Sequence, residues 1–439
     1  MNRVVEKSGL RSSMVFDTAV ESATWNEGSK CYEIETLGTK GGDRRSMTAK
    51  FLISCTGQLN VPKTPKYATD YVQGRSLSPS SAGGGGPVVM HSAEFDRTVP
   101  LAGKTVAIIG NGSTGVQLVE SLQPVAGRLL LFQRSPKWGV AKPFYRIPSV
   151  VLWTLQNLLP FNLGNRLLRC LCYVWVETLH VAVSKPGVLQ RAFQWHLKSS
   201  LLKANPEAES MNCLPAYRPG CSRIIVYAGF PKALTQPNVT VVNDAVQGFT
   251  PSGQIETRSP SKEGEPDGGK GTTLHDVDVV ILATGFTVTD CGPQFKVTNA
   301  GGATVQEVWK GAAAKWGGAT LFGICTPTFP NFFVIYGPHT NTILGSITFF
   351  SECAAAYAAQ CVESVLGAGK EKAEVKEEAV ARYNGFVRRS FVGRPEMDTC
   401  SAWYKGGAGN DIPVTNYPGG MTGYWWATRK WNRADFEVT

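Results

Sequence analysis

The sequence lacks any unbroken hydrophobic run of the roughly 20 residues that a transmembrane helix needs. Residues 147–183 come nearest, but Arg166, Arg169 and Glu177 interrupt them and Pro160 breaks them. This pattern argues against a membrane-spanning helix and favours helices that are buried or that line a substrate pocket, with membrane contact as the lesser alternative. We therefore expect no stable membrane insertion.

The sequence also lacks a C-x-x-C pair and any cluster of histidine and cysteine, although it holds 11 cysteines and five histidines. These spacings do not match the common zinc sites or the dithiol redox motif, so we expect no metal. Cys170 and Cys172 are two residues apart and would point to different sides of a helix. We interpret the cysteines as reduced thiols. Residues 1–10 do not resemble a signal peptide, which favours a cytoplasmic protein.

Charge is modest, at 18% of residues, and no long block of one sign occurs. The net charge of +10 is spread out, with short clusters at 40–45 and 388–389. We therefore do not expect nucleic acid as a partner, and phosphate-bearing cofactors are enough to explain the positive sign. An apolar fraction of 43%, with 47 glycines and 26 prolines, is typical of an α/β enzyme with two or three domains.

The most informative feature that is present lies at residues 106–119. An apolar run leads into the turn G-N-G-S-T-G, and an amphipathic segment follows. In a strand–turn–helix unit, Gly110 permits the tight turn, Gly112 lets the backbone approach a pyrophosphate, and Gly115 lets the helix pack closely on the sheet. The N-terminus of the helix would face the anion. The pattern predicts the first half of a dinucleotide-binding unit.

A second apolar run ends at Arg134 and Ser135. An NAD-specific enzyme usually carries an acidic residue at this position. An arginine fork with a hydroxyl group suits the extra 2′-phosphate of NADP instead. The pair therefore predicts NADP, and the alternative is an ordinary surface charge at the end of a strand.

The remaining pattern predicts alternating strands and helices. Residues 74–87 are rich in glycine and serine and residues 258–273 are polar, so both are expected to be surface loops. The expected elements are the end of a helix within 1–10, strands at 14–20, 31–36, 49–54, 224–226, 239–242, 277–282 and 332–336, several helices within 145–205, and a long helix at 349–366.

The order of the motifs is more specific than any one of them. Along the chain stand C-T-G, His91, G-N-G-S-T-G, Q-R-S, G-C-S-R, A-T-G-F and F-P-N-F-F-V-I-Y-G-P-H-T-N. This order resembles the Baeyer–Villiger and related flavin-containing monooxygenases, and the resemblance runs over essentially the whole chain. It looks closest to fungal members that act on polyketide-derived ketones.

The resemblance implies an α/β fold with two nested Rossmann-like dinucleotide-binding domains and a helical insertion. The implied parts are 1–98, a remnant of the FAD-binding domain; 99–141 and 221–286, the two parts of the NADP-binding domain; 142–220, a helical substrate-lining insertion; and 287–439, the C-terminal part of the FAD-binding domain. The oligomeric state is not predicted.

Members of that family reduce FAD with NADPH, let the reduced flavin react with O2, and insert an oxygen atom beside the carbonyl group of a ketone. An active-site arginine holds the negative charge that develops on the oxygen, and the matching residue is Arg223 in G-C-S-R. Arginine suits this task because it stays protonated. The implied partners are O2 and a bulky ketone of secondary metabolism. The alternative reading of Arg223 is a surface arginine at the start of a strand.

The resemblance also assigns residues to both cofactors, although each could be an ordinary turn residue. In the family a lysine often stands beside the catalytic arginine and reaches the 2′-phosphate. Ser222 occupies that position here, so a weaker preference for NADPH is expected. The implied residues are Gly110, Gly112, Ser113, Thr114, Gly115, Arg134 and Ser135 for NADP, and Thr56, Gly57, Thr284, Gly285, Gly337, Thr340 and Asn341 for FAD.

His91 and Asp96 match part of the family fingerprint F-x-G-x-x-x-H-x-x-x-W-[P/D]. Phe95 stands where the tryptophan is expected, and a glycine-rich stretch replaces the early F-x-G. These departures favour the broader flavin monooxygenase family over the specific Baeyer–Villiger fingerprint. Alternatively, His91 is a linker histidine that fixes the backbone by hydrogen bonds.

Two motifs expected near the start of such a protein are not among these residues. They are an earlier G-x-G-x-x-G for the ADP part of FAD, and a G-T-W…Y-P-G-x-x-x-D stretch with a catalytic aspartate. We expect that the first FAD-binding βαβ unit is missing because the sequence begins at an internal methionine. The alternatives are a flavin-free relic that binds NADP and a non-redox enzyme. N- or S-hydroxylation is the nearest rival activity.

Overall fold

A computed structural model gives the structure of the chain. It describes residues 2–73, 86–142, 148–157, 163–259, 271–287, 292–316, 319–398, 400, 404 and 413–439. Most of the two expected loops, 74–87 and 258–273, lies outside these residues. Helices and strands alternate along the described residues, so the predicted α/β class is confirmed.

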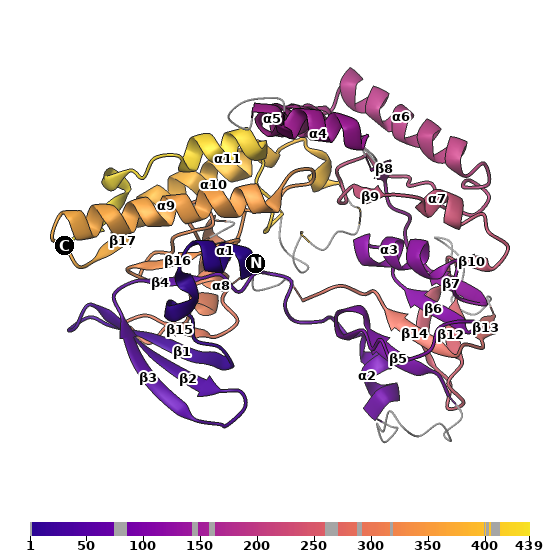
Figure 1. The fold of residues 1–439 in the computed structure, drawn as a ribbon, viewed down its shortest axis with the longest axis horizontal. Coiled ribbons are helices and arrows are strands. Elements are labelled where there is room, and N and C mark those ends of the chain that lie inside the picture. The colour runs from indigo at the N-terminus through magenta and orange to yellow at the C-terminus, as the bar shows by residue number, and fades with distance from the viewer. Residues whose placement is uncertain are drawn as a thin grey trace.

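A parallel sheet of five strands, in the order β10-β7-β6-β14-β5, organises the half drawn on the right in Figure 1. Every side chain of β14 is buried, as expected of a central strand that is covered on both faces. Helix α3 packs on one face, and α2 lies on the other. The bounds are Lys66–Gln73 for α2, Val88–His91 for β5, Thr105–Ile109 for β6, Ser113–Leu122 for α3, Arg128–Phe132 for β7, Val239–Val242 for β10 and Val279–Leu282 for β14.

A second, three-stranded sheet packs near α2, and the sequence did not predict it. Its strands are β11 (Ala245–Phe249), β12 (Ile255–Arg258) and β13 (Thr272–His275). Ile255 is fully buried in the cluster that also holds Ala68 of α2. The strands are short and β13 is largely exposed, so they lack the apolar alternation that marks a strand in a sequence.

The N-terminal strands form a four-stranded sheet in the order β15-β1-β2-β3. The strand expected at 14–20 is displaced, because 10–13 form a 3-10 helix and the strand continues to the buried Trp25. The single strand expected at 49–54 is also wrong, since its residues divide between β3 and β4, which belong to different sheets. The bounds are Asn2–Lys7 for α1, Thr18–Asn26 for β1, Cys31–Gly38 for β2, Arg44–Ala49 for β3, Leu52–Ser54 for β4 and Lys296–Thr298 for β15.

Strand β4 pairs in parallel with β16 (Phe332–Val334), and the long helix α9 covers the nearby core. Helix α9 runs over Ile347–Gly367, which confirms the helix expected at 349–366. Its buried side chains pack against α10, α11 and the short β17–β18 pair. The bounds are Val305–Trp316 for α8, Ala373–Val375 for β17, Glu377–Phe391 for α10, Gly420–Thr428 for α11 and Phe436–Val438 for β18.

Helices α4 (Ser149–Asn157), α5 (Leu163–Ser184) and α6 (Val188–Ala204) form the upper rim of the molecule in Figure 1 and confirm the expected helices within 145–205. The buried face of α5 carries Glu177, whose Oε1 accepts from the amides of Met421 and Thr422 and so caps α11. The opposite face is exposed and apolar, so burial, one of the two expectations for these helices, holds for only one side of α5.

Short elements join this rim to the parallel sheet. Strand β8 (Gly139–Ala141) pairs with β9 (Ile225–Tyr227), and α7 (Phe230–Ala233) follows. The carboxylate of Glu120 on α3 accepts from the amides of Ala228, Gly229 and Phe230, each at 2.8 Å. This cap ties α3 to the segment that returns from the helical rim.

The buried His180 of α5 makes the stability of the fold sensitive to acid. Burial and the nearby positive charge of Arg394 lower the pKa of His180 to about 4. Above pH 6.5 the imidazole is neutral in both the folded and the unfolded chain. As the pH falls from 6.5 towards 4, the unfolded chain takes up the proton first, so stability falls by about 2 kcal/mol at pH 5.

We predict that the free energy of unfolding, measured in urea, falls between pH 7 and pH 5 by about 2 kcal/mol less in His180→Asn than in the parent protein. His196→Asn is the matched control, because that ring is exposed on α6. An equal pH response in the parent and His180→Asn would contradict this explanation.

Candidate functional site

The glycine turn after β6 is built from two tight contacts and one open position. Gly110 has φ 110°, and a Cβ there would lie 2.6 Å from the carbonyl oxygen of Ala283. A Cβ on Gly115 would lie 2.0 Å from the carbonyl oxygen of Gly110. A Cβ on Gly112, by contrast, would meet no atom within 4 Å. The first two glycines serve packing, and Gly112 leaves the turn open to a ligand.

Helix α3 begins directly after this turn with its first amides uncapped by any side chain, because its N-cap residue is Gly112. Ser113 and Thr114 are exposed at its first turn. Free amides and the helix dipole together favour an anion at such a terminus. The geometry therefore fits a pyrophosphate.

Asn111 connects the glycine turn to the end of β7. Its Nδ2 donates to Oε1 of Gln133 and to the backbone carbonyl of Ser135, both at 2.9 Å. Gln133 in turn donates to Oδ1 of Asn243 at 3.0 Å. The structure thus brings the predicted Ser135 and the predicted glycine turn together. Sequence reasoning passed over Asn111 because it occupies a variable position of the motif.

Two cations gather after β7. Arg134 is exposed, and Lys137 is partly buried beside a small apolar pocket that includes Trp138 and Val116. Burial lowers the pKa of Lys137, and the positive charge of Arg134 lowers it further. The sequence did not reveal Lys137, because the tripeptide P-K-W resembles the ordinary end of a strand. Two neighbouring cations that repel one another suit a doubly charged phosphate.

The strands β5, β6 and β14 all end at the same edge of the parallel sheet. There the Nε2 of His91 lies 3.1 Å from the carbonyl oxygen of Gly285, while its Nδ1 accepts from the amide of Ala93. Because Nδ1 accepts, Nε2 carries the proton and donates. His91 is buried, so this geometry agrees with the linker alternative.

Two linkers run side by side from this edge towards the other half. The hydroxyl group of Thr284 donates to the carbonyl of Lys63 at 2.6 Å, and the amide of Lys63 donates to the carbonyl of Gly285 at 2.9 Å. Gly285 has φ 84°, which favours glycine. Thr284 and Gly285 therefore hold a crossing between the halves.

Asp96 lies apart from these groups. Its Oδ1 accepts from the amide and hydroxyl group of Thr98, and these bonds lower its pKa. The carboxylate is exposed and fixes the turn that precedes β6. Nothing in the geometry brings Asp96 to either cofactor edge.

Five of the seven residues predicted for FAD, all except Thr284 and Gly285, follow the ends of β4 and β16. Thr56 and Gly57 follow β4, and Gly337 follows β16. Gln58 joins the two ends, since its Nε2 donates to the carbonyls of Tyr336 and Gly337, both at 2.8 Å. Sequence reasoning missed Gln58, although it directly follows the predicted T-G.

The turn after β16 is held in an uncommon backbone conformation. Tyr336 and His339 have φ of 67° and 56°, although neither is glycine. The hydroxyl group of Thr340 donates to the carbonyl of Gly337 at 2.6 Å. Asn341 is fixed through its backbone, which bonds Thr415 and Tyr417.

Several buried polar atoms around this turn have no partner in the described structure. They are Oε1 of Gln58, both ring nitrogens of His339, both amide atoms of Asn341 and Nδ2 of Asn416. Leaving such atoms unpaired is costly in a native protein. Their chemistry, a set of neutral donors and acceptors, fits a polar heterocyclic ring such as that of a flavin.

Arg223 is half-buried just before β9. The next residue, Ile224, is buried in one cluster with Ile343 and Leu344, which follow the Asn341 turn. The structure therefore brings the Arg223 segment to the predicted flavin turn, on the side of the helical rim.

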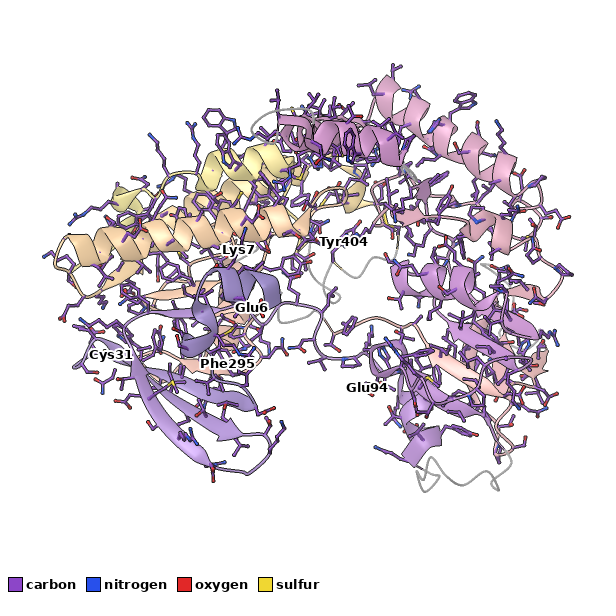
Figure 2. The ribbon with its side chains drawn as sticks, viewed as in Figure 1. Glu6, Lys7, Cys31, Glu94, Phe295 and Tyr404 are labelled. Carbon is purple, nitrogen blue, oxygen red and sulfur yellow. A yellow bond between two sulfur atoms is a disulfide. The ribbon has the colours of Figure 1, made fainter. Side chains whose placement is uncertain are left out.

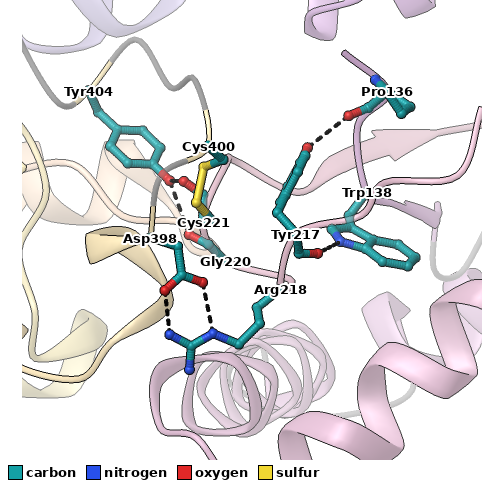
Figure 3. Close-up of a disulfide and its surroundings, with 9 residues drawn as sticks. All are labelled: Pro136, Trp138, Tyr217, Arg218, Gly220, Cys221, Asp398, Cys400 and Tyr404. Carbon is teal, nitrogen blue, oxygen red and sulfur yellow. Dashed lines mark hydrogen bonds and ion pairs between the residues drawn. A yellow bond between two sulfur atoms is a disulfide. The ribbon is translucent and has the colours of Figure 1, made fainter. Parts of the chain in front are cut away.

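A disulfide between Cys221 and Cys400 anchors the Arg223 segment (Figure 3), which makes the prediction of reduced thiols wrong for this pair. The two residues are 179 positions apart, and only the fold brings them together. The side chains of Arg218 and Asp398 form a two-bonded ion pair beside it. Tyr404, near the centre of the molecule in Figure 2, donates its hydroxyl group to the carbonyls of Gly220 and Cys221.

The comparison with known proteins finds relatives over nearly the whole chain, although no protein-family model matches it. A Baeyer-Villiger monooxygenase of Streptomyces coelicolor is 30% identical over 444 residues, which cover 100% of this chain and 77% of that protein. The FAD-binding monooxygenase ktnD of Aspergillus niger is 25% identical over 449 residues, which cover 99% of this chain and 68% of that protein. The crystal structure of OTEMO in complex with FAD and NADP shares the fold, with a TM-score of 0.71, 20% identity, and coverage of 100% of this chain and 84% of its own.

The disulfide yields a prediction about stability. Closing so long a loop raises the free energy of unfolding by up to roughly 5 kcal/mol in the chain-entropy description. We expect a reductant to lower the Tm of the air-oxidised parent protein but not the Tm of Cys400→Ser. Cys170→Ser is the control, because Cys170 is exposed and unpaired with another cysteine, and its Tm should fall like that of the parent protein. A non-reducing peptide map that shows Cys221 and Cys400 both free after air oxidation would contradict the pairing.

Proposed function

Because this chain belongs to the Baeyer–Villiger monooxygenase family, we propose that it uses FAD and NADPH to insert one oxygen atom of O2 beside the carbonyl group of a ketone. The product is an ester or a lactone. The relative from Streptomyces coelicolor carries that family name, and OTEMO binds both cofactors. The chain is a flavoprotein monooxygenase, and the residues below are our proposal for how it works.

The observation that carries this proposal is that the Arg223 segment reaches the turn whose buried polar atoms lack partners. The unpartnered polar atoms of Gln58, His339 and Asn341 surround the turn after β16. The Arg223 segment reaches the same region through Ile224. The glycine turn of α3 lies at the carboxyl edge of the adjoining parallel sheet, where nucleotides bind in open α/β sheets.

Each proposed role follows from the chemistry of a group. The amides at the start of α3 bind the pyrophosphate of NADP, and Arg134, Ser135 and Lys137 hold its 2′-phosphate. FAD, when bound, supplies the reaction with O2. The guanidinium group of Arg223 stabilises the negative charge on oxygen because it remains protonated in a low-dielectric site. The turn at 337–341, with Thr56 and Gly57, orients the flavin ring, and His91 holds the linkers at fixed separation.

We propose a bulky, apolar ketone as the substrate, such as one derived from a polyketide. Support comes from the apolar cluster of Trp138, Leu197 and Ile343 beside the Arg223 segment. We propose the cytoplasm as the location in the cell. The reducing conditions there would open the Cys221–Cys400 bond, and the ion pair of Arg218 and the hydrogen bonds of Tyr404 would then hold the segment.

The first experiment purifies the full chain, records its absorption spectrum, and measures NADPH oxidation and ester formation with a panel of apolar ketones. We expect a yellow protein that forms esters. Arg223→Ala should lower ester formation by about 100-fold or more while NADPH oxidation continues, because the stabilising charge is lost. Arg433→Ala, an exposed arginine near the C-terminus, is the control.

Three outcomes would contradict this proposal. A folded, colourless protein that still binds NADPH would favour the flavin-free alternative. A flavoprotein whose Arg223→Ala variant forms ester at the full rate would remove the proposed catalytic residue. Oxygenation of amines or sulfides, with no ester from any ketone, would favour N- or S-hydroxylation.

A second prediction concerns the choice of nucleotide. Arg134→Ala and Lys137→Ala should each raise the KM for NADPH about tenfold and leave the KM for NADH nearly unchanged, because NADH lacks the 2′-phosphate. Lys104→Ala is the matched control, since Lys104 lies at the amino end of the same sheet, paired with Asp278. An equal rise in the KM for NADPH and for NADH would show that these cations do not bind the 2′-phosphate.

A further inference from the structure

The outer face of the helical rim is apolar, contrary to the usual pattern of a surface helix. On α5, Leu163, Leu167, Leu171, Val174 and Val181 are each 50% to 55% exposed. They recur every three or four residues, apart from the exposed Thr178 between the last two, and so share one side of the helix. The opposite side packs on α11 through Tyr173, Glu177 and His180. The exposed stripe is therefore a second apolar face.

The neighbouring helices extend this stripe into a surface. On α4, Val150 and Trp153 are 74% and 58% exposed, and on α6, Val188 and Trp195 are 80% and 72% exposed. Helix α5 contacts both α4 and α6. The three helices lie together along the upper rim in Figure 1, and Figure 2 shows their side chains projecting outward. We call the exposed apolar side chains of α4, α5 and α6 the rim surface.

The segment that holds the rim surface is rich in positive charge. Between residues 142 and 205 the sequence holds eight lysines and arginines and a single acidic residue, Glu177. That stretch carries seven of the ten net positive charges of the chain. Its one carboxylate faces inward as the cap of α11. Arg166 and Arg169 are exposed on α5, and Arg191 is exposed on α6.

These features distinguish a membrane-surface helix from a spanning one. Residues 166–184 form a helix that is long and apolar enough to cross a membrane by composition. However, its inner side is committed to α11 through Glu177, so that side cannot face lipid without losing the cap. An exposed apolar side, exposed tryptophans and a high content of lysine and arginine are typical of helices that lie in the plane of an anionic bilayer.

We propose that the rim surface docks this protein on the surface of an anionic lipid bilayer, with α5 lying parallel to the membrane plane. The apolar side chains enter the boundary between headgroups and acyl chains, and the arginines contact lipid phosphates. A bilayer also dissolves apolar ketones, so docking would bring such substrates to the enzyme. Binding itself does not depend on the oxygenation chemistry.

The test is sedimentation of the full chain with vesicles of phosphatidylcholine alone or with about one-third phosphatidylserine. We expect binding to the anionic vesicles that weakens as salt increases. Leu171→Gln/Val174→Gln and Arg166→Gln/Arg169→Gln should each lower the bound-to-free ratio about tenfold or more.

Two control variants match these changes elsewhere. Val125→Gln/Val392→Gln removes two other exposed apolar side chains, and Arg44→Gln/Arg45→Gln removes two charges from β3, far from the rim. Both should bind like the parent protein, and circular dichroism of every variant checks the fold.

Three results would overturn the proposal. The first is no binding to anionic vesicles, or equal binding by the rim variants and their controls. The second is retention in the membrane after alkaline carbonate extraction, which would indicate a spanning helix. The third is a dimer in analytical ultracentrifugation that Leu171→Gln/Val174→Gln dissociates, without vesicle binding by the parent protein, which would make a second copy the occupant.

Discussion

The close approach of three backbones at Gly110, Gly115 and Ala283 is the constraint on which the rest of the structure depends. It joins β6, α3 and β14 with no room for a side chain at either glycine. Because β14 leads directly into Thr284 and Gly285, the same contact sets where the linkers leave the parallel sheet. His91 then fixes that exit through the carbonyl of Gly285. The position of one nucleotide-binding turn thus determines the path of the chain into the other half.

A second connection reaches the same region from the opposite direction. The disulfide of Cys221, the ion pair of Arg218 and the hydrogen bonds of Tyr404 all act on four consecutive residues, 218–221. Arg223 lies two positions later, so its segment is held at both the helical rim and the C-terminal half. A guanidinium group that must meet a developing charge gains from such fixation, because little reorganisation is left for the reaction itself.

Local signals in the sequence predicted the elements whose pattern is complete over a few residues. The turn at 110–115 and the strand 239–242 agree with the structure, because glycine spacing and apolar runs act locally. The residues at 49–54 look like one strand but divide between two sheets, since pairing partners such as β16 lie almost 300 residues away. The same distance explains why the sequence did not reveal Gln58 and the Cys221–Cys400 pair, because the partners of each lie far along the chain.

For the rim helices, the sequence predicted that the segment is helical and apolar, but not which side of each helix is exposed. Arg166, Arg169 and Glu177 argue against a spanning helix, and the apolar residues between them predict helices that are buried or that line a substrate pocket. Burial of one face is indeed provided by α11, yet α5 has apolar residues on two sides, and a single neighbour can cover only one of them. Hydrophobic content alone therefore does not tell whether a residue faces the core, a pocket or a bilayer. That distinction depends on which neighbours cover each side of the helix, and the outer apolar side of α5 is exposed in the part of the chain that the structure describes.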